Sequence, residues 1–411
     1  MSVPSLADPE GEQHRVPGRL GVYLDDVYWV VQRDGETLIS TDRSFLLFVC
    51  EVGDAFDSLL VFGRTVDSAE PSDYVLPASV RLERLPHYAT LRHAPQVVRA
   101  LGGTVRSFWR GLDQVDRLWV FGPHPFAVVL AVLGALRRKQ VVLGVRQDTV
   151  RLYKARLPSK WSPSLLAARA VEGAYRLLAR RMPTTVQGAE LAERYGGERP
   201  QLLTMTESVV RRADVDLEPR ERDFSGELEL LTVGRFETEK NPLLLVEALA
   251  RLERERPGRF RLTWVGRGPL EDDVLRRTAE LGLQDRITFL SYVAFGPDLL
   301  ALYRRAHAFV HVSLSEGVPK VLLEAFACST PIVATDVGGV RVALADGRAG
   351  LLVPPDDLDE LVAAILRLAD EPRLRDALVV KGLELAQELT LEAQADRVVG
   401  FIAGSQAPAP G

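Results

Sequence analysis

The chain has 411 residues, 46% of them hydrophobic and 26% charged, and a formal net charge of −5. This length predicts two or three domains with full α/β cores. The acidic balance argues against a nucleic-acid-binding protein, which would carry an excess of Lys and Arg.

We expect a cytoplasmic protein, because residues 1–18 are polar, are expected to be disordered and contain no apolar signal segment. The longest apolar run, residues 126–136, is too short to cross a bilayer. Cys50 and Cys328 stand in apolar surroundings and are expected to be buried thiols, not a disulfide pair.

Residues 19–212 predict a first α/β domain. Its opening strand, 20–24, is followed by an acidic and aromatic loop as far as residue 42 and by a helix from about Ser44. The other expected elements are strands over 58–63 and 80–85, a βαβ unit over 118–145, a helix over 165–181 and a strand over 184–187.

His124 lies in the loop between the strand 118–121 and the helix 126–138. Ligands of open α/β sheets bind at the carboxyl ends of the strands, so this histidine is a candidate for the active site. The alternative is a histidine that caps the helix or borders the core.

A basic segment follows the strand 141–145. Its charged residues are Arg146, Asp148, Arg151, Lys154, Arg156 and Lys160. An anionic acceptor, such as a lipid-linked phosphate, or an anionic membrane surface would explain this charge, and a solvated basic loop is the alternative. We take Arg146 and Lys154 as candidates for acceptor binding.

Residues 213–226 form a dense polar run that predicts a linker to a second α/β domain over 227–390. A C-terminal helix is expected over 391–405, and the Pro/Ala-rich tail 406–411 is expected to be disordered.

The second domain begins with a strand, 228–233, that runs into Gly234 and Arg235 and then into Lys240, Asn241 and Pro242. Asn241 suits the N-cap of the following helix and Pro242 its first residue. Two cations beside a helix N-terminus predict a pyrophosphate site. The alternative for Lys240 is an ordinary solvated charge.

The next strand, 260–265, runs into a turn that contains Gly266 and Gly268. Glu271 stands where a dinucleotide-binding motif has its third glycine, so the turn is a weak nicotinamide signal.

Two carboxylates, Glu316 and Glu324, flank the start of a helix that follows the strand 308–312. Pro319 suits the first turn of this helix, and Lys320 adds a cation. Carboxylates at the carboxyl end of a strand can accept pairs of hydroxyls from a sugar and a ribose. The alternative is one loop Glu and one surface Glu on a solvated helix.

The motifs of the second half, in order, resemble glycosyltransferase family four. They are Gly-Arg…Lys-Asn-Pro, Val-Gly-x-Gly-Pro, Ser-Glu-Gly-x-Pro…Glu-Ala, Pro-Ile-Val-Ala-Thr, Val-Gly-Gly and Gly-Leu-Leu-Val-Pro. The resemblance implies the GT-B fold, with two Rossmann-like domains facing across a cleft, the first for the acceptor and the second for a nucleotide-sugar donor. The C-terminal helix would return to the first domain. One departure is Ser329, which stands where the family usually has the glycine that ends the motif helix.

By this resemblance, Arg235 and Lys240 would hold the donor diphosphate and Glu324 the ribose. Glu316 would meet the transferred sugar, together with backbone N–H groups near Gly317 and Val318. Gly234, Gly266 and Lys320 complete the expected donor-binding residues, and His124 joins Arg235, Lys240 and Glu316 as an expected catalytic residue.

The implied activity is retaining transfer of a sugar to an acceptor hydroxyl, in bacterial glycan, glycolipid or exopolysaccharide synthesis. We expect no obligatory metal and no cofactor besides the nucleotide sugar, and a peripheral contact with the inner face of the plasma membrane stays open. A nucleotide-sugar epimerase on the same fold and a non-catalytic nucleotide-sugar-binding subunit are the alternatives.

Overall fold

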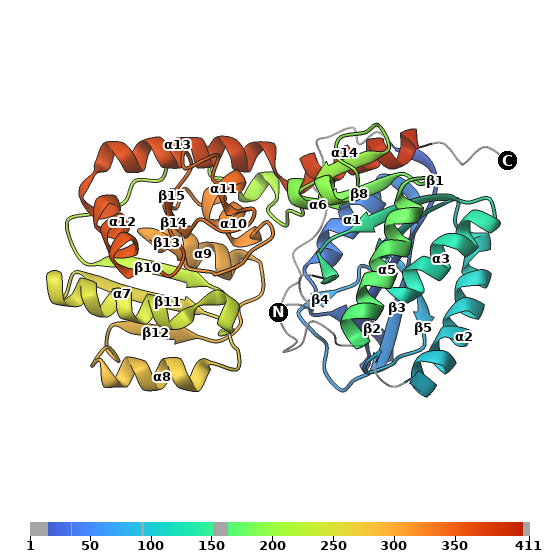
Figure 1. Ribbon diagram of the computed structural model, residues 1–411, viewed down its shortest axis with the longest axis horizontal. Coiled ribbons are helices and arrows are strands. Elements are labelled where there is room, and N and C mark those ends of the chain that lie inside the picture. The colour runs from blue at the N-terminus through green and yellow to red at the C-terminus, as the bar shows by residue number, and fades with distance from the viewer. Residues whose placement is uncertain (1–14, 34, 92–93, 151–162, 406–411) are drawn as a thin grey trace. The chain divides into compact units, whose positions relative to one another are not determined.

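The computed structural model of the protein describes residues 15–33, 35–91, 94–150 and 163–405. The chain divides into two compact units. The first consists of the described residues of Met1–Val186, Tyr195–Leu203 and Ala395–Gly411, and the second of Gln187–Arg194 and Thr204–Gln394. In each unit a sheet is covered by helices (Figure 1).

The sheet of the first unit has the strand order β4-β2-β1-β6-β7-β8-β9, with β3 paired to β1 and β5 paired to β3. Its strands are β1 Val16–Arg33, β2 Glu36–Thr41, β3 Phe56–Asp67, β4 Tyr74–Val75, β5 Arg81–Leu85, β6 Arg117–Gly122, β7 Gln140–Val145, β8 Thr184–Gln187 and β9 Leu202–Met205. The α-helices of this part of the chain are α1 Phe45–Asp54, α2 Ala94–Gly111, α3 Pro125–Leu136, α5 Pro163–Ala179 and α6 Ala189–Arg194, and α14 Leu391–Gly404 ends the described chain.

The expected loop after the opening strand was a wrong prediction. β1 begins at Val16 and continues to Arg33, and β2 pairs with its end in antiparallel register, Trp29 opposite Ser40. The acidic residues suggested a loop, but Tyr28 and Val30 are almost fully buried, and Trp29 between them is more exposed. Apolar residues at this period of two favour a strand with one buried face. Residues 16–18, which were expected to be disordered, belong to β1, and residues 1–14 and 406–411 lie outside the described residues.

The second unit has a six-stranded, fully parallel sheet in the order β12-β11-β10-β13-β14-β15. Its strands are β10 Leu228–Val233, β11 Phe260–Val265, β12 Ile287–Leu290, β13 Ala308–His311, β14 Ile332–Thr335 and β15 Leu351–Val353. The strand order reverses between β10 and β13. At such a switch point the loops after the two strands run to opposite sides and leave a crevice that binds ligands.

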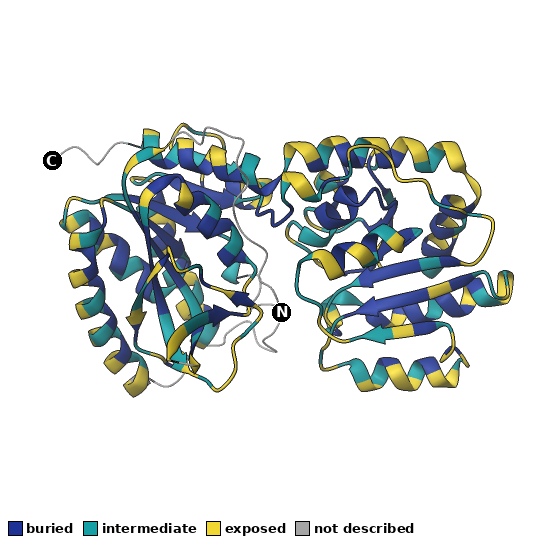
Figure 2. Cartoon of the chain, turned by 180° about the vertical axis from the view of Figure 1, so that it is seen from behind, coloured by how far each residue is buried: buried dark blue, intermediate teal, exposed yellow. Residues whose placement is uncertain are grey.

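Helices cover both faces of this sheet. They are α7 Pro242–Glu255, α8 Glu271–Glu280, α9 Pro297–Arg305, α10 Lys320–Ala327, α11 Val340–Ala343, α12 Leu358–Asp370 and α13 Pro372–Glu388. Leu230 packs into the core on the side of α7 and α12, and the next residue, Leu231, packs into the core on the side of α9, α10 and α13. Both faces are therefore apolar, and the central strands are buried while the outer helix faces are exposed (Figure 2).

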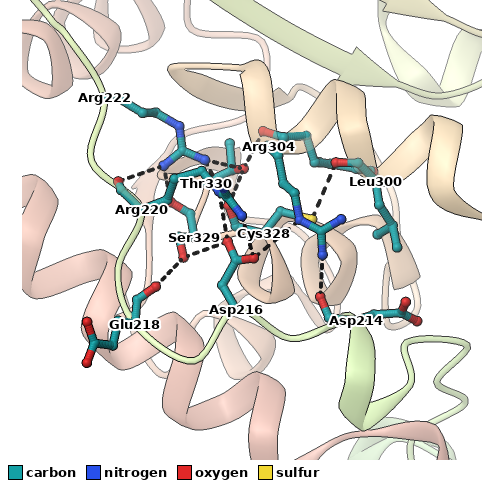
Figure 3. A network of polar contacts seen from close by, with 11 residues as sticks. Asp214, Asp216, Glu218, Arg220, Arg222, Leu300, Arg304, Cys328, Ser329 and Thr330 are labelled. Atoms are coloured by element: carbon teal, nitrogen blue, oxygen red, sulfur yellow. Dashed lines mark hydrogen bonds and ion pairs between the residues drawn. The ribbon is translucent and has the colours of Figure 1, made fainter.

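The boundary between the two units does not lie in the expected linker, residues 213–226, because Thr204–Gln394 belongs wholly to the second unit. Within the expected linker, Arg222 donates hydrogen bonds to the carbonyl oxygens of Ser329 (2.7 Å) and Cys328 (2.8 Å) at the end of α10 (Figure 3). The Ser329 hydroxyl donates to Asp216 Oδ2 at 3.2 Å. These hydrogen bonds attach the expected linker to the end of α10 in the second unit.

The same contacts explain how a serine can end α10. Ser329 has a φ of 55°, the left-handed conformation in which glycine usually ends a helix. At this buried helix end, the carbonyl oxygens of Cys328 and Ser329 are satisfied by Arg222, and the serine holds the conformation without being glycine.

Two further expectations can be compared with the structure. Cys50 and Cys328 are free and buried, which confirms the prediction of two buried thiols. Among the described residues, no helix has the length and apolar character that crossing a membrane requires.

Candidate active site

Two neighbouring strand ends of the second unit lie beside the switch point. Gly234 and Arg235 follow β10, and Gly266 follows β11 beside it. A Cβ atom on Gly266 would overlap the carbonyl oxygen of Gly234, so no larger residue fits here. The glycine turn thus serves the close packing of two loops, which explains its presence without a nicotinamide site.

Arg235 and Lys240 stand at the two ends of the loop between β10 and α7. The Arg235 side chain is 58% exposed and pairs with Glu237 at 2.6 Å. Lys240 ends a 3₁₀ turn, Thr238–Lys240, directly before the residue that precedes α7. Lys240 therefore lies beside a helix N-terminus, an arrangement that favours anions, and Arg235 adds a second cation to the same loop.

Asn241 is the N-cap residue of α7, as predicted, but it does not cap the helix through its side chain. Asn241 holds the N-cap position in a left-handed conformation, with a φ of 47°, and its side chain makes no capping hydrogen bond. Its amide donates to Asp356 Oδ1 at 3.0 Å instead. Pro242 is the first helical residue, as expected, whereas Pro319 precedes α10 and Lys320 is the first residue of that helix.

Glu316 lies in the loop between β13 and α10 and faces the cations after β10. Lys240 Nζ contacts Glu316 Oε1, and the Ser313 hydroxyl donates to the same oxygen at 2.6 Å. His311 Nε2 lies 3.0 Å from it. Burial by itself would raise the pKa of the Glu316 carboxyl, but the His311 hydrogen bond and the Lys240 charge outweigh it and hold the pKa at about 2. Glu316 is therefore an anion at any physiological pH.

The paired glycines after β14 pack against the backbone of the loop that contains Glu316. A Cβ atom on Gly338 would overlap the carbonyl oxygen of Glu316, and one on Gly339 would overlap that of Gly317. The Gly339 N–H donates to the Gly317 carbonyl at 3.0 Å. This close backbone contact needs residues without side chains, which accounts for the Val-Gly-Gly motif.

A small, open pocket lies at the ends of β10, β11 and β13. It is lined by Thr232, Val233, Gly234, Arg235, Lys240, Trp264, His311, Val312 and Ser313. The structure thus brings Gly234, Arg235 and Lys240 together, with Glu316 in direct contact with Lys240.

Glu324 lies on α10 and is almost completely buried, with 5% of its surface exposed. The Tyr303 hydroxyl, from α9, donates to Glu324 Oε2 at 2.8 Å. Burial raises the pKa of Glu324 to about 7, although the Tyr303 hydrogen bond and the Lys320 charge favour the carboxylate. The alternative interpretation, a surface glutamate on a solvated helix, is therefore not what the structure has.

The other residues expected at the donor site differ in exposure. Gly317 is exposed and Val318 half-buried, so the backbone of this loop is accessible. Lys320 contacts the carboxylate of Glu207, which is buried at 2% exposure. No local sequence pattern pointed to this partner, because Glu207 is 113 residues away along the chain.

His124 belongs to the first unit and makes contacts through both ring nitrogens. Nδ1 accepts from the Phe126 N–H at 3.3 Å at the start of α3, so the proton is on Nε2. Nε2 lies 3.1 Å from the Tyr88 hydroxyl and 3.3 Å from Asp25 Oδ2. Burial lowers the pKa of His124, while Asp25 opposes this shift and Arg64 adds to it. The Nδ1 atom thus caps α3, as the alternative interpretation expected, whereas the Nε2 atom does not. A catalytic role for His124 stays a prediction.

Of the basic segment, Arg146 and Asp148 are described, and Arg151, Lys154, Arg156 and Lys160 lie outside the described residues. The Arg146 guanidinium stacks over the Phe45 ring at 3.6 Å, close to β7 and α1. Its expected role towards an acceptor stays a prediction.

Comparison with known proteins identifies the domain that contains this pocket. The sequence model of the family described as Glycosyl transferases group 1 matches residues 227–371, which include the Arg235–Lys240 loop, Glu316 and Glu324. The second unit belongs to the glycosyl transferases group 1 family.

Curated relatives of this group 1 domain are glycosyltransferases. A D-inositol 3-phosphate glycosyltransferase of Pseudarthrobacter chlorophenolicus is 36% identical over 221 residues, 50% of this chain and 50% of that protein. An α-D-kanosaminyltransferase of Streptomyces kanamyceticus is 33% identical over 176 residues, 42% of this chain and 44% of that protein. The chain spans about half the length of the curated relatives it matches.

Solved structures match nearly the whole chain. Sucrose-phosphate synthase from Thermosynechococcus elongatus has a TM-score of 0.68 at 21% identity and covers 93% of this chain and 98% of its own. HepE of Anabaena, solved with UDP and glucose, has a TM-score of 0.64 at 16% identity and covers 94% and 99%. These likenesses show the GT-B fold and confirm the predicted fold class.

Sequence reasoning missed His311, Ser313, Tyr303 and Glu207, which contact the expected site residues. His311 is part of the run 308–312, which was interpreted as a strand from its apolar residues alone. A histidine among buried strand residues was the available signal, because a buried polar side chain needs a partner.

Proposed function

We propose that this protein is a retaining glycosyltransferase that moves a sugar from a nucleoside diphosphate sugar to an acceptor hydroxyl, in glycan, glycolipid or exopolysaccharide synthesis. The observation that carries the proposal is the convergence of Arg235, Lys240 and Glu316 at one switch point, two of them lining an open pocket. The glycosyltransferase relatives support it, and HepE binds UDP and glucose.

The chemistry requires stabilisation of a leaving diphosphate. The bond from the anomeric carbon to the diphosphate breaks, the bond to the acceptor oxygen forms on the same face of the sugar, and the acceptor proton passes to the diphosphate. Arg235, Lys240 and the α7 N-terminus would stabilise the negative charge that develops, which is the main electrostatic contribution. Because these groups supply positive charge, we propose that no metal is obligatory.

The sugar and the ribose would be bound by the two carboxylates. Glu316, held as an anion, would accept hydroxyls of the transferred sugar near the backbone N–H groups of Gly317 and Val318. Glu324 would accept the ribose hydroxyls once it is ionised. We propose His124 and Arg146 of the first unit for the acceptor side.

A binding screen followed by a turnover assay tests the function. UDP, GDP and ADP and their glucose conjugates are compared for their effect on the melting temperature, because a ligand at a hundred times its Kd stabilises by about 2.7 kcal/mol. The nucleotide sugar that binds is then incubated with an acceptor extract, with and without EDTA, and the anomeric configuration of the product is determined by NMR. We expect transfer with retention in both samples.

The same assay separates the alternatives. Turnover of the nucleotide sugar to an epimer without acceptor would support the epimerase, and binding without any turnover would support a non-catalytic subunit. An inverted product, or failure of all nucleotides to bind, would contradict the proposal.

A membrane contact is favoured by the outer helices of the first unit. α2, α3 and α5 lie side by side on one face of its sheet (Figure 1). α2 carries Arg99, Arg106 and Arg110 without an acidic residue, and Arg138 follows α3. Large apolar side chains are exposed on the same three helices, namely Val98, Trp109, Val132, Leu136, Leu166 and Leu177. A helix with cations and an exposed tryptophan suits the surface of an anionic bilayer.

We therefore expect the protein to co-sediment with vesicles that contain phosphatidylglycerol and not with pure phosphatidylcholine. Each lysine or arginine near such a surface contributes about 1 kcal/mol, so Arg106→Gln, Arg110→Gln and Arg138→Gln together should weaken binding on the order of a hundredfold. The matched control replaces Arg251, Arg276 and Arg367 on the second unit, all of them at least 45% exposed. Equal losses in the two triple variants would contradict this contact.

A further inference from the structure

A buried histidine at the donor site has no role in the function proposed above. His311 is the last residue of β13, lines the pocket and is 4% exposed. Its Nε2 atom lies 3.0 Å from Glu316 Oε1 and 3.2 Å from the Ser313 hydroxyl oxygen. Burying an imidazole costs free energy unless its polar atoms are bonded, so this position needs an explanation.

The proton of His311 can be placed from its partners. A carboxylate is only an acceptor, so the nitrogen that approaches Glu316 Oε1 must carry the hydrogen. Ser313 donates its own hydrogen to the same Oε1 at 2.6 Å. His311 and Ser313 therefore act together as two hydrogen-bond donors, fixed at the end of a buried strand.

All contacts of the Glu316 carboxylate are made by one oxygen. Lys240, Ser313 and His311 meet at Oε1, and Oε2 has no hydrogen bond to the described residues. The side chain keeps 11% of its surface exposed. The carboxylate thus has one oxygen held by the protein and one oxygen left to accept a hydroxyl group.

We propose that His311 is a positioning residue, which with Ser313 holds Glu316 so that Oε2 is presented to the transferred sugar of the donor. This proposal rests on the function proposed above, in which Glu316 accepts sugar hydroxyls and Lys240 acts on the diphosphate. It assigns a role to a residue outside the motifs that carry the family resemblance.

The need for His311 follows from the two demands on Lys240. In the structure the ammonium group contacts Glu316, but an incoming diphosphate is also an anion and competes for the same charge. His311 and Ser313 lie on β13 and directly after it, behind the carboxylate. They can hold Oε1 in place while Lys240 turns to the diphosphate.

The test compares His311→Leu with His311→Gln. Leucine removes the donor, whereas the amide nitrogen of glutamine can occupy the place of Nε2 and donate to Oε1. A hydrogen bond to a charged group contributes about 1.5–3 kcal/mol, so we expect the leucine variant to lose roughly ten- to a hundredfold in kcat/KM for the nucleotide sugar. Its Kd for UDP, or for GDP or ADP if that is the nucleotide bound, should stay within about twofold. Glutamine should recover most of the loss.

The matched control is His307→Gln, just before the other end of the same strand, where the ring bonds the backbone N–H of Glu229. This variant should transfer sugar as the wild type does. Circular dichroism checks the fold, and Ser313→Ala, which removes the smaller donor, serves if the leucine variant does not fold.

The outcomes separate the two proposals. A wild type that binds the nucleoside diphosphate but transfers no sugar overturns the proposed function. A wild type that transfers sugar, together with a leucine variant that is equally active, overturns the role of His311. The role is overturned as well if leucine weakens nucleoside diphosphate binding as much as transfer, or if glutamine is as poor as leucine.

Discussion

We expect Lys240→Ala to lower the rate of glycosyl transfer on the order of a hundredfold, with the fold intact. Losing a charge that acts on the transition state typically costs about 3 kcal/mol. In this protein the ammonium group also contacts Glu316, so its loss additionally leaves that carboxylate with one cation fewer. Single-turnover transfer rates with the nucleotide sugar, measured for wild type and variant, give the result.

Arg235→Ala should also lower transfer, because its exposed guanidinium can reach a diphosphate in the pocket. The matched control is Lys381→Ala on α13, a lysine that pairs with Glu384 one turn away on the same helix. Near-normal turnover in both Lys240→Ala and Arg235→Ala would contradict the proposed diphosphate site.

Glu324→Gln should have two opposite effects. It should weaken the binding of the free nucleoside diphosphate on the order of a hundredfold, because a neutral amide replaces a carboxylate expected to accept two ribose hydroxyls. At pH 8 it should also stabilise the unliganded protein, because no charge is then buried on α10. The glutamine carbonyl can still accept the hydrogen bond of Tyr303.

The pH range of the stability effect follows from the pKa of Glu324. The folded protein keeps the proton up to about pH 7, whereas the unfolded chain releases it near the ordinary value of 4.5. The stability of the wild type relative to the variant therefore falls as pH rises from 4.5 to 7. The gain in free energy of unfolding from Glu324→Gln should reach about 3 kcal/mol above pH 7 and vanish below pH 4.5.

Calorimetry with the nucleoside diphosphate and denaturant unfolding at pH 5 and pH 8 measure both effects. The matched variant is Glu316→Gln, which should leave nucleoside diphosphate affinity nearly unchanged and impair sugar transfer. Equal losses of nucleoside diphosphate affinity in the two variants would contradict the assignment of ribose and sugar. A pH-independent stability difference would contradict the buried acid.

Local patterns were enough for most helices and strands of the second unit. Mostly apolar runs such as 228–233 and 260–265 became β10 and β11 with those bounds, because a strand buried on both faces is apolar at most positions. The cations after β10 could be expected near an anion because strand, loop and helix follow one another directly in the sequence. In the first unit the same rule failed at β1, where acidic residues on a half-exposed strand resembled a loop.

The sequence by itself determined the GT-B fold class and the candidate donor residues, since both depend on motifs whose members are close along the chain. Only the tertiary structure decided which atoms meet: Lys240 with Glu316, His311 behind the same oxygen, Tyr303 on Glu324, and Gly338 against the Glu316 backbone. These contacts depend on the reversal of strand order between β10 and β13, which brings loops some 76 residues apart to one edge of the sheet. The ionisation of the two carboxylates is a further consequence, because burial and nearby charge, which arise only on folding, move one pKa to about 2 and the other to about 7.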